Sequence, residues 1–257
     1  MRTQFAVWLD GIGLQDLDPR IYVTDVEEAP LQTKQHLHPR LSSGGMFASP
    51  ALRQKLTVTV HFLIHESDPI RRKRLLMQVS AWAQRGSTLT VSDRPHQQLH
   101  VQAETLPAMA SSLKWTDPLS LTFAACAYPW WEEIVPVSLT LLSGETAAMH
   151  LPGTSAHVPV SVNAVNTSGG TISSLTLTCG ETTLTLEGLA WANGEELLIG
   201  PDSLGLMTMT VGGRNAASCR TPQSSDWLLI PCGAPATISV SCERNVAVTV
   251  SAKGAWV

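Results

Sequence analysis

Residues 56–86 read LTVTVHFLIHESDPIRRKRLLMQVSAWAQRG, and this stretch decides the fold of the first half of the chain. Apolar residues alternate with polar ones from Leu56 to Ile64, which predicts a strand with one buried face. Pro69 suits the first turn of a helix that Ser67 or Asp68 can cap. A single apolar stripe and then Gly86 follow, so we expect a helix over about 69–85 that lies on a sheet. The stripe consists of Leu75, Leu76, Val79, Trp82 and Ala83.

Shorter strands are expected elsewhere in the first half. Residues 3–9 alternate weakly and run into Asp10-Gly11, which is a turn signal. Residues 35–50 are polar and contain Ser42-Ser43-Gly44-Gly45, which predicts a long loop or an extended hairpin. Further strands are predicted at 21–23, 88–91, 99–104 and 119–125, with turns at Asp93-Arg94-Pro95 and Thr116-Asp117-Pro118.

The second half has a different character. From Pro136 onward Ser, Thr, Val, Leu and Gly dominate, and turn residues recur about every ten positions. Short strands with regular turns and no helical stripe are typical of a β-sandwich. The predicted strands are 158–162, 174–178, 182–186, 197–199, 207–211, 236–240 and 246–250, and the turn signals are Ser168-Gly169-Gly170, Cys179-Gly180, Asn193-Gly194 and Gly212-Gly213.

Charge also divides the chain. Residues 1–135 carry 13 Lys+Arg and 13 Asp+Glu, whereas residues 136–257 carry 4 and 8, which accounts for the whole net charge of -4. We therefore expect two domains, 1–135 and 136–257, with the boundary near 131–136. The expected fold class is mainly β. The N-terminal domain is predicted to be α+β, with one helix on a β-sandwich or split barrel, and the C-terminal domain to be a β-sandwich.

Composition excludes several classes of protein. Of the 257 residues, 44% are hydrophobic and 15% charged, which is a folded profile, and the small net charge argues against a nucleic-acid binder with a dominant basic face. No apolar run approaches the roughly 18 residues of a membrane span, and Met1 to Asp10 show no secretory signal, so we expect folding in a cytosol. The five cysteines match no zinc module and are interpreted as buried free thiols: Cys126, Cys179, Cys219, Cys232 and Cys242.

Two groups of residues could in principle bind a metal or a partner. His61 and His65 belong to a strand and its end, and His36 and His38 lie in the polar loop without a completing Cys or carboxylate, so we expect no metal site. The basic run 71–74 predicts either a solvated helix face or a charged surface that meets a partner subunit or a channel. Cations at a helix N-terminus oppose the macrodipole, and acidic groups across an interface would offset that cost.

No set of residues indicates catalysis. Glu132-Glu133 and Glu195-Glu196 are neighbours in sequence that point to opposite sides of a strand, and we interpret both pairs as solvated. There is no GxSxG, phosphate loop or HExxH motif. We therefore expect no catalytic residues, no metal, no cofactor and no enzymatic activity. Trp191 and Trp227 could stack on sugars, although core packing is the commoner use of such residues.

A series of motifs, taken in order and spacing, resembles one known family over nearly the whole chain. In the first half these are Leu9-Asp10-Gly11, Ser43-Gly44-Gly45, the strand 56–64, the helix ending 81–86, Ser92-Asp93-Arg94-Pro95, Glu104-Thr105-Leu106-Pro107, the strand 119–123 and the aromatic stop Tyr128-Pro129-Trp130-Trp131. In the second half they are Asn193-Gly194 before 197–199, Gly212-Gly213-Arg214-Asn215 and the segment 226–233. This pattern is similar to that of the distal tail proteins of siphophages and of related prophage tail components.

The resemblance implies a structural hub at the far end of a phage tail. In this family the N-terminal domains form a hexameric ring, single or as two stacked rings, and galectin-like β-sandwiches surround it. The implied partners are further copies of the chain, the major tail tube protein and a tail-tip or tail-associated fibre protein. DNA is implied only as cargo that passes through the lumen, and no membrane is involved. The implied location is the virion tail tip, after assembly in the bacterial cytoplasm.

The chain departs from sugar-binding galectins. It has no His-x-Asn-Pro-Arg sequence, and residues 191–196 contain no arginine to complete a Trp-x-x-Glu-x-Arg set. The alternative from another class is a carbohydrate-binding, receptor-recognition module of a phage tail tip, which predicts an exposed Trp191 or Trp227. A secreted accessory domain of a glycosidase is a weaker alternative, because we see no signal peptide.

Overall fold

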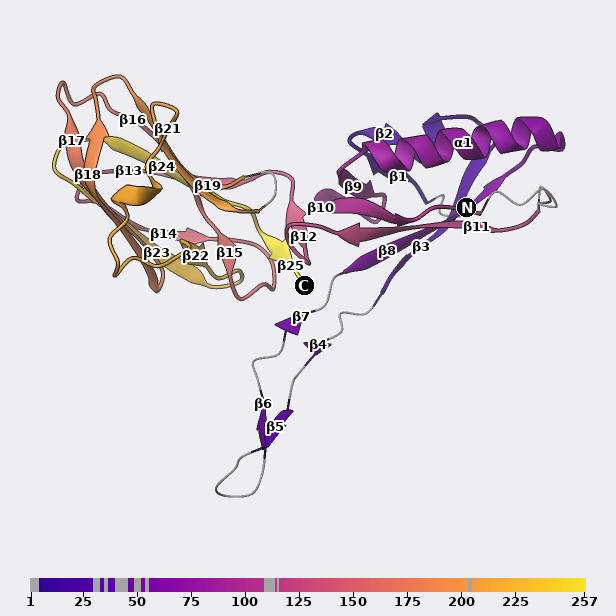
Figure 1. Ribbon diagram of the computed structural model, residues 1–257, viewed down its shortest axis with the longest axis horizontal. Helices are drawn as coiled ribbons and strands as arrows, with labels where there is room; N and C mark the ends of the chain where they lie inside the picture. Colours follow the sequence, from indigo (N-terminus) through magenta and orange to yellow (C-terminus); the bar gives the residue numbers. More distant parts are fainter. Residues whose placement is uncertain are drawn as a thin grey trace. The chain divides into compact units, whose positions relative to one another are not determined.

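The computed structural model describes residues 5–29, 56–108, 114, 116–202 and 205–257, together with four short strands between residues 33 and 53. The chain divides into two compact units, Met1–Trp131 and Glu132–Val257. Strands dominate both units, and the expected mainly β fold class is confirmed (Figure 1).

The first unit is built around a sheet of antiparallel strands in the order β2-β1-β9-β10-β11-β8-β3. The long antiparallel pairings of β8 with β3 and β11 lie at one end of this sheet, where β3 is the edge strand. The elements are β1 (Val7–Leu9), β2 (Ile12–Gly13), the 3-10 helix η1 (Leu14–Asp16), β3 (Ile21–Glu28), β8 (Thr57–Ile64), α1 (Pro69–Arg85), β9 (Thr88–Val91), β10 (Arg94–Thr105) and β11 (Leu119–Ala125). Strand β12 (Trp131–Glu133) begins on the last residue of this unit and continues into the second.

Residues 56–86 form the strand and the helix that the sequence predicts. Residues alternate between buried and half-buried along β8, and α1 spans Pro69–Arg85. The Asp68 side chain accepts a hydrogen bond from the Ile70 backbone N–H at 2.9 Å, so Asp68 rather than Ser67 is the N-cap. Figure 1 shows α1 lying across one face of the sheet. All five residues of the apolar stripe are buried against that face.

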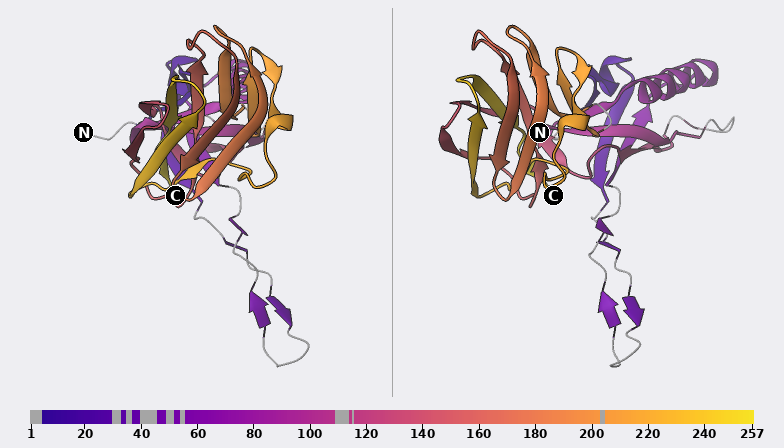
Figure 2. Two further views of the ribbon diagram at one scale, coloured as in Figure 1. Left: turned by 90° about the vertical axis from the view of Figure 1, so that its left-hand side faces the viewer. Right: turned by 60° about the vertical axis from the view of Figure 1, so that its left-hand side comes forward.

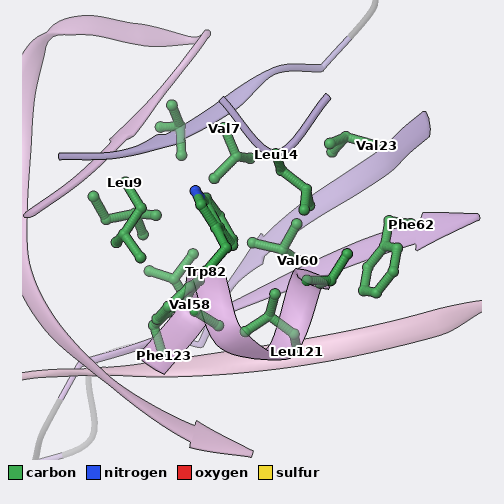
Figure 3. Packing of buried hydrophobic residues seen from close by; sticks show 14 of the residues in the cluster. Val7, Leu9, Leu14, Val23, Val58, Val60, Phe62, Trp82, Leu121 and Phe123 are labelled. Atoms are coloured by element: carbon green, nitrogen blue, oxygen red, sulfur yellow. The ribbon is translucent and has the colours of Figure 1, made fainter. Parts of the chain in front are cut away.

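Trp82 lies at the centre of the packing between α1 and the sheet (Figure 3). Its ring meets Phe123 of β11 edge to face, with centroids 6.1 Å apart. Its indole Nε1 donates to the backbone carbonyl oxygen of Ile12 at 3.0 Å. The indole therefore buries its apolar body and keeps its one polar atom paired, which lets a large side chain fill the core without an unsatisfied donor.

Gly86 ends α1 for a different reason from the one its position suggests. Its backbone is extended, with φ -92° and ψ 158°, rather than left-handed. A Cβ placed here would come within 2.1 Å of Cγ of Leu9. Glycine is thus needed because β1 packs closely on the helix end.

Two turns of the first unit can be compared with expectation. Asp10 and Gly11 both have positive φ, 51° and 79°, and the expected turn between β1 and β2 is confirmed. In contrast, β10 already begins at Arg94, so the predicted turn at Asp93-Arg94-Pro95 is wrong by one to two residues. The register of β10 against β9 shifts between Arg94 and Leu99, and this irregularity accommodates Pro95 inside a strand.

Four short strands are described between residues 33 and 53. β4 (Thr33–Lys34) pairs with β7 (Leu52–Arg53), and β5 (Leu37–Pro39) pairs with β6 (Met46–Ala48), both antiparallel. These pairings are those of a hairpin, one of the two forms expected for 35–50. The remaining residues of that segment, including the Ser42–Gly45 motif, lie outside the described residues.

The second unit contains two main antiparallel sheets, in the orders β13-β24-β16-β19-β20-β21 and β14-β23-β17-β18 (Figure 2, pink to yellow). Its elements are β13 (Val137–Leu142), β14 (Thr146–His150), β15 (Val158–Pro159), β16 (Ser161–Val165), β17 (Ile172–Cys179), β18 (Thr182–Trp191), β19 (Glu196–Pro201), β20 (Met207–Val211), β21 (Arg214–Asn215), the 3-10 helix η2 (Ala217–Cys219), β22 (Leu229–Ile230), β23 (Pro235–Cys242), β24 (Ala247–Ala252) and β25 (Ala255–Trp256).

Alternate residues of these strands form the core of the second unit. Leu175 and Leu177 of one sheet and Val248 and Val250 of the other are at most 1% exposed. The glycine turns predicted from the sequence are present, because Gly169, Gly180, Gly194, Gly212 and Gly213 all have positive φ. Strands β13 and β14 were not among the predicted strands, and they supply one edge of each sheet.

The packing of Trp82 gives the first testable prediction. Trp82→Ala should lower the free energy of unfolding by about 3–5 kcal/mol, because it leaves a large cavity under α1. Gln78→Ala, at an exposed position of the same helix, is the matched control and should change it by at most about 0.5 kcal/mol. Urea denaturation followed by circular dichroism measures both. A loss below about 1 kcal/mol for Trp82→Ala would show that the stripe does not hold the helix.

Candidate interaction surfaces

The basic run at the start of α1 does not act as one solvated face. Arg71, Lys73 and Arg74 are exposed, but Arg72 is only 6% exposed and lies on the buried side of the helix. One of its nitrogens donates to the Ser67 carbonyl oxygen at 3.4 Å. The interpretation of 71–74 as a uniformly solvated surface is therefore wrong at Arg72, because four consecutive residues of a helix surround most of its circumference.

Acidic residues fix the start of α1. The Arg20 guanidinium pairs with Asp18 at 2.8 Å and also with Glu66, and Glu66 accepts a hydrogen bond from the Asp68 backbone N–H at 3.0 Å. The hydrogen bond from Arg20 holds the pKa of Asp18 at about 2, against an ordinary value of 3.8. The pKa of Glu66 is lowered, first by the Asp68 N–H and then by the charge of Arg20. This network orients the N-terminus of the basic helix.

Strand β3 forms one edge of the first unit's sheet, and its second half is acidic. Asp25 and Glu27 are exposed, and Glu27 lies 3.4 Å from Nε2 of His61. The pairing of β3 with β8 shifts register between Val23 and Asp25, which leaves Thr24 as the extra residue of a β-bulge. This edge strand therefore exposes carboxylates, and its hydrogen-bond ladder is interrupted at the bulge.

The aromatic stop packs where the first unit ends. Nε1 of Trp131 donates to Glu28 at 2.9 Å, and Arg94 pairs with the same carboxylate at 3.0 Å while lying 5.0 Å above the Trp131 ring. Tyr128 and Trp130 stack with centroids 4.8 Å apart. The stop is thus a packed structural feature that ties β3, β10 and β12 together.

The candidate metal residues are placed apart from one another. His61 lies within β8 beside Glu27, and His65 follows the strand and meets Tyr22 edge to face. His36 lies outside the described residues, as does the side chain of His38. Within the described ranges, no three His, Cys, Asp or Glu side chains gather as metal ligands would. No helix in those ranges has the length and apolar character to cross a bilayer.

The adjacent carboxylates 132–133 are engaged, which corrects their interpretation as solvated. Glu132 is 12% exposed in its side chain and pairs with Lys253 at 2.6 Å. Glu133 accepts a hydrogen bond from Nε1 of Trp256 at 2.7 Å. Their partners come from the C-terminal end of the chain, and together they tie β12 to β25.

The pair Glu195-Glu196 is solvated only in part. The Glu195 side chain accepts a hydrogen bond from the Ala192 backbone N–H at 2.9 Å, and Arg214 donates to both of its carboxylate oxygens at 2.8 Å. Glu196, in contrast, is exposed. Trp191 is fully buried, and its Nε1 donates to the Glu195 carbonyl oxygen at 2.8 Å. An arginine absent from the local sequence thus reaches this turn from β21, but the tryptophan faces the core and presents no platform for a sugar.

The cysteines differ in exposure. Only Cys179 is buried, and burial raises the pKa of its thiol to about 12. Cys126 is exposed and the other three are partly exposed, so the interpretation of all five as buried thiols is wrong for four of them. All five are unbridged. Burial also raises the pKa of Cys232, whose sulfur accepts the Ala255 N–H.

The second unit has a shallow hollow of about 480 Å³ that sequence reasoning did not locate. Its lining is mostly apolar, and its polar side chains are those of His157, Glu181, Thr182 and Thr237. Four segments that are separate in the sequence contribute to it, at positions 157, 180–182, 229–231 and 235–237. No pattern along the chain could have brought these residues together.

This fold is that of phage tail hub and baseplate proteins. The Dit protein of phage SPP1, described as a paradigm of the hub adsorption apparatus of phages that infect Gram-positive bacteria, is similar with a TM-score of 0.71 and 13% identity, over 97% of this chain and 98% of that one. Two structures of the phage P2 baseplate in its activated conformation, with Ca and with Sr, are similar with TM-scores of 0.51 and 0.52 and identities of 8% and 10%. They cover 98% and 97% of this chain, and 97% of the matched chain in both cases.

The sequence alone matches no family model and no curated protein. At identities of 8–13% the structural comparisons establish the fold. The expected resemblance to distal tail proteins is confirmed at that level.

The ion pair of Asp18 predicts a specific acid dependence. Because the folded pKa of Asp18 is depressed, its contribution to stability is present above pH 3.8 and is lost as the pH falls to about 2. Asp18→Asn removes that contribution, so the melting temperature should fall less steeply between these pH values than in the wild type. Asp93→Asn, in an exposed turn, is the control. Equal slopes for wild type and Asp18→Asn would contradict the pairing with Arg20.

The burial of Trp191 predicts that the second unit has no sugar site on this residue. A glycan array probed with the full chain should show no reproducible binding, since a sugar site needs several placed polar groups around an exposed aromatic ring. Trp227 is half-exposed, so Trp227→Ala is the variant to test if the array shows binding. Binding that disappears in Trp227→Ala but persists in the Trp256→Ala control would establish the carbohydrate-binding alternative.

Proposed function

We propose that this chain is a structural hub protein at the distal end of a siphophage or prophage tail. In this role it forms a hexameric ring that joins the tail tube to the tail tip or baseplate and lets DNA pass through its lumen. Its partners are then copies of itself, the major tail tube protein and a tail-tip or tail-associated fibre protein. It works in the virion tail tip, is assembled in the host cytoplasm and catalyses no reaction.

The observation that carries this proposal is the extent of the likeness to SPP1 Dit. A β-sandwich alone is too common to indicate a function. The match covers 97% of this chain and therefore includes both compact units in their order. A chance likeness between two common β folds would cover only one of them.

The two domains 1–135 and 136–257 take different roles in this proposal. The first builds the ring, and the second is a galectin-like domain at the outside that meets other tail proteins. A closed ring of identical subunits uses two different surfaces on each copy, and these must be complementary. The charges of residues 1–135 cancel, with 13 Lys+Arg and 13 Asp+Glu, and this balance suits a lumen that DNA passes without being bound.

The assembly state tests this proposal. Light scattering on the purified full chain should give six times the 27.6 kDa mass of one chain, or twelve times for two stacked rings. Raising the protein concentration should leave that mass unchanged, because a closed ring has no free ends. A monomer that persists at high protein concentration would contradict the ring.

A further inference from the structure

The outward face of α1 carries charge that nothing in the described part of the chain neutralises. The helix contains five basic residues and no acidic one. Ile70, Lys73, Arg74 and Met77 stand at i, i+3, i+4 and i+7, so they share one face, and all four are exposed. Among partners in the described ranges, an ion pair is formed by Arg71 alone of the five basic residues, with the cap residue Asp68 at 3.6 Å. We call the four residues 70, 73, 74 and 77 the helix face.

This arrangement is unfavourable for an isolated subunit. Cations in the first turns of a helix oppose the positive end of its macrodipole. The apolar members of the helix face add to the cost, since Ile70 is 66% exposed and Met77 54%. Both features become favourable where an acidic and partly apolar surface covers the helix.

The second half of β3 has the complementary character. Asp25 and Glu27 project from this edge strand, and the Glu27 side chain is 66% exposed. Tyr22, on the same strand, is a 45% exposed aromatic residue. We call the three residues 22, 25 and 27 the acidic edge.

The β-bulge at Thr24 indicates what kind of element covers this edge. A bulged edge cannot continue a regular ladder, so the addition of another strand is disfavoured. An edge of this kind is covered instead by a helix or a loop, through side-chain contacts. A basic helix with exposed apolar residues fits these requirements.

We propose that the helix face of one copy docks on the acidic edge of the next copy, with Lys73 and Arg74 meeting Asp25 and Glu27. Ile70 and Met77 then pack near Tyr22. The inference rests on the ring proposed above and assigns its subunit interface. Both surfaces belong to the first unit and differ from each other, which is the requirement for a head-to-tail contact.

Charge reversal in the full chain tests this assignment. One variant carries Lys73→Glu and Arg74→Glu, so both of its surfaces are acidic. The other carries Asp25→Lys and Glu27→Lys, so both of its surfaces are basic. The affected residues are exposed, and each variant should keep the wild-type circular dichroism spectrum. Glu181→Lys with Glu187→Lys, at exposed positions of the second unit, changes the net charge as the second variant does and is its matched control.

Each charge-reversal variant alone should be monomeric, whereas the matched control should assemble as the wild type does. An equimolar mixture of the two variants should recover six-copy particles in which they alternate, because each acidic surface then meets a basic one. Native mass spectrometry resolves the composition, with three copies of each variant as the expected result.

The outcomes separate this inference from the ring itself. A wild type that forms six-copy particles while both variants also do so would overturn the interface and leave the hub proposal standing. Recovery of dimers in the mixture would replace the head-to-tail contact by a two-fold one. Binding of a duplex DNA probe by the wild type that is lost in the Lys73→Glu, Arg74→Glu variant, with assembly unchanged, would assign the helix face to phosphate contacts and overturn the inference. A wild type that stays monomeric would contradict both proposals.

Discussion

The burial of one stripe of α1 on the sheet is the constraint on which the first unit depends. Trp82 fills the space between the helix and strands β8 and β11, and its indole N–H is paired with the Ile12 carbonyl oxygen. The opposite side of α1 therefore faces outward and exposes basic residues such as Lys73 and Arg74. The same packing requires a glycine at position 86, where Leu9 approaches too closely for a side chain. The core therefore determines which surface is available for a partner.

The helix and most strands could be predicted from the sequence, because their signals lie within short stretches of the chain. Contacts between residues far apart in the sequence could not be predicted. The limits of α1 follow from Asp68, Pro69 and a stripe of consistent period, all within one stretch. The acid pairs were misinterpreted because their partners lie far along the chain, as Lys253 does for Glu132. Strand β14 was missed because the sequence of Thr146–His150 lacks strong β-forming residues. The β-bulge in β3 leaves no clear pattern in sequence.

Several described residues of this protein that could have indicated a reaction centre have structural roles instead. Its carboxylate pairs hold strands together, its one fully buried cysteine is a core residue, and Trp191 packs inward. What remains unexplained by folding is a basic helix face and an acidic edge on the same unit. In the proposed ring, these two features are the halves of one contact between neighbouring copies.

The central claim is that copies of this chain close into a ring with a passage for DNA. Electron microscopy of the purified protein tests it most directly, because class averages report both symmetry and the presence of an opening. We predict six-fold averages with a central channel wide enough for duplex DNA and with peripheral density from the second unit. Particles without rotational symmetry, or rings whose centre is filled by protein, would contradict the account.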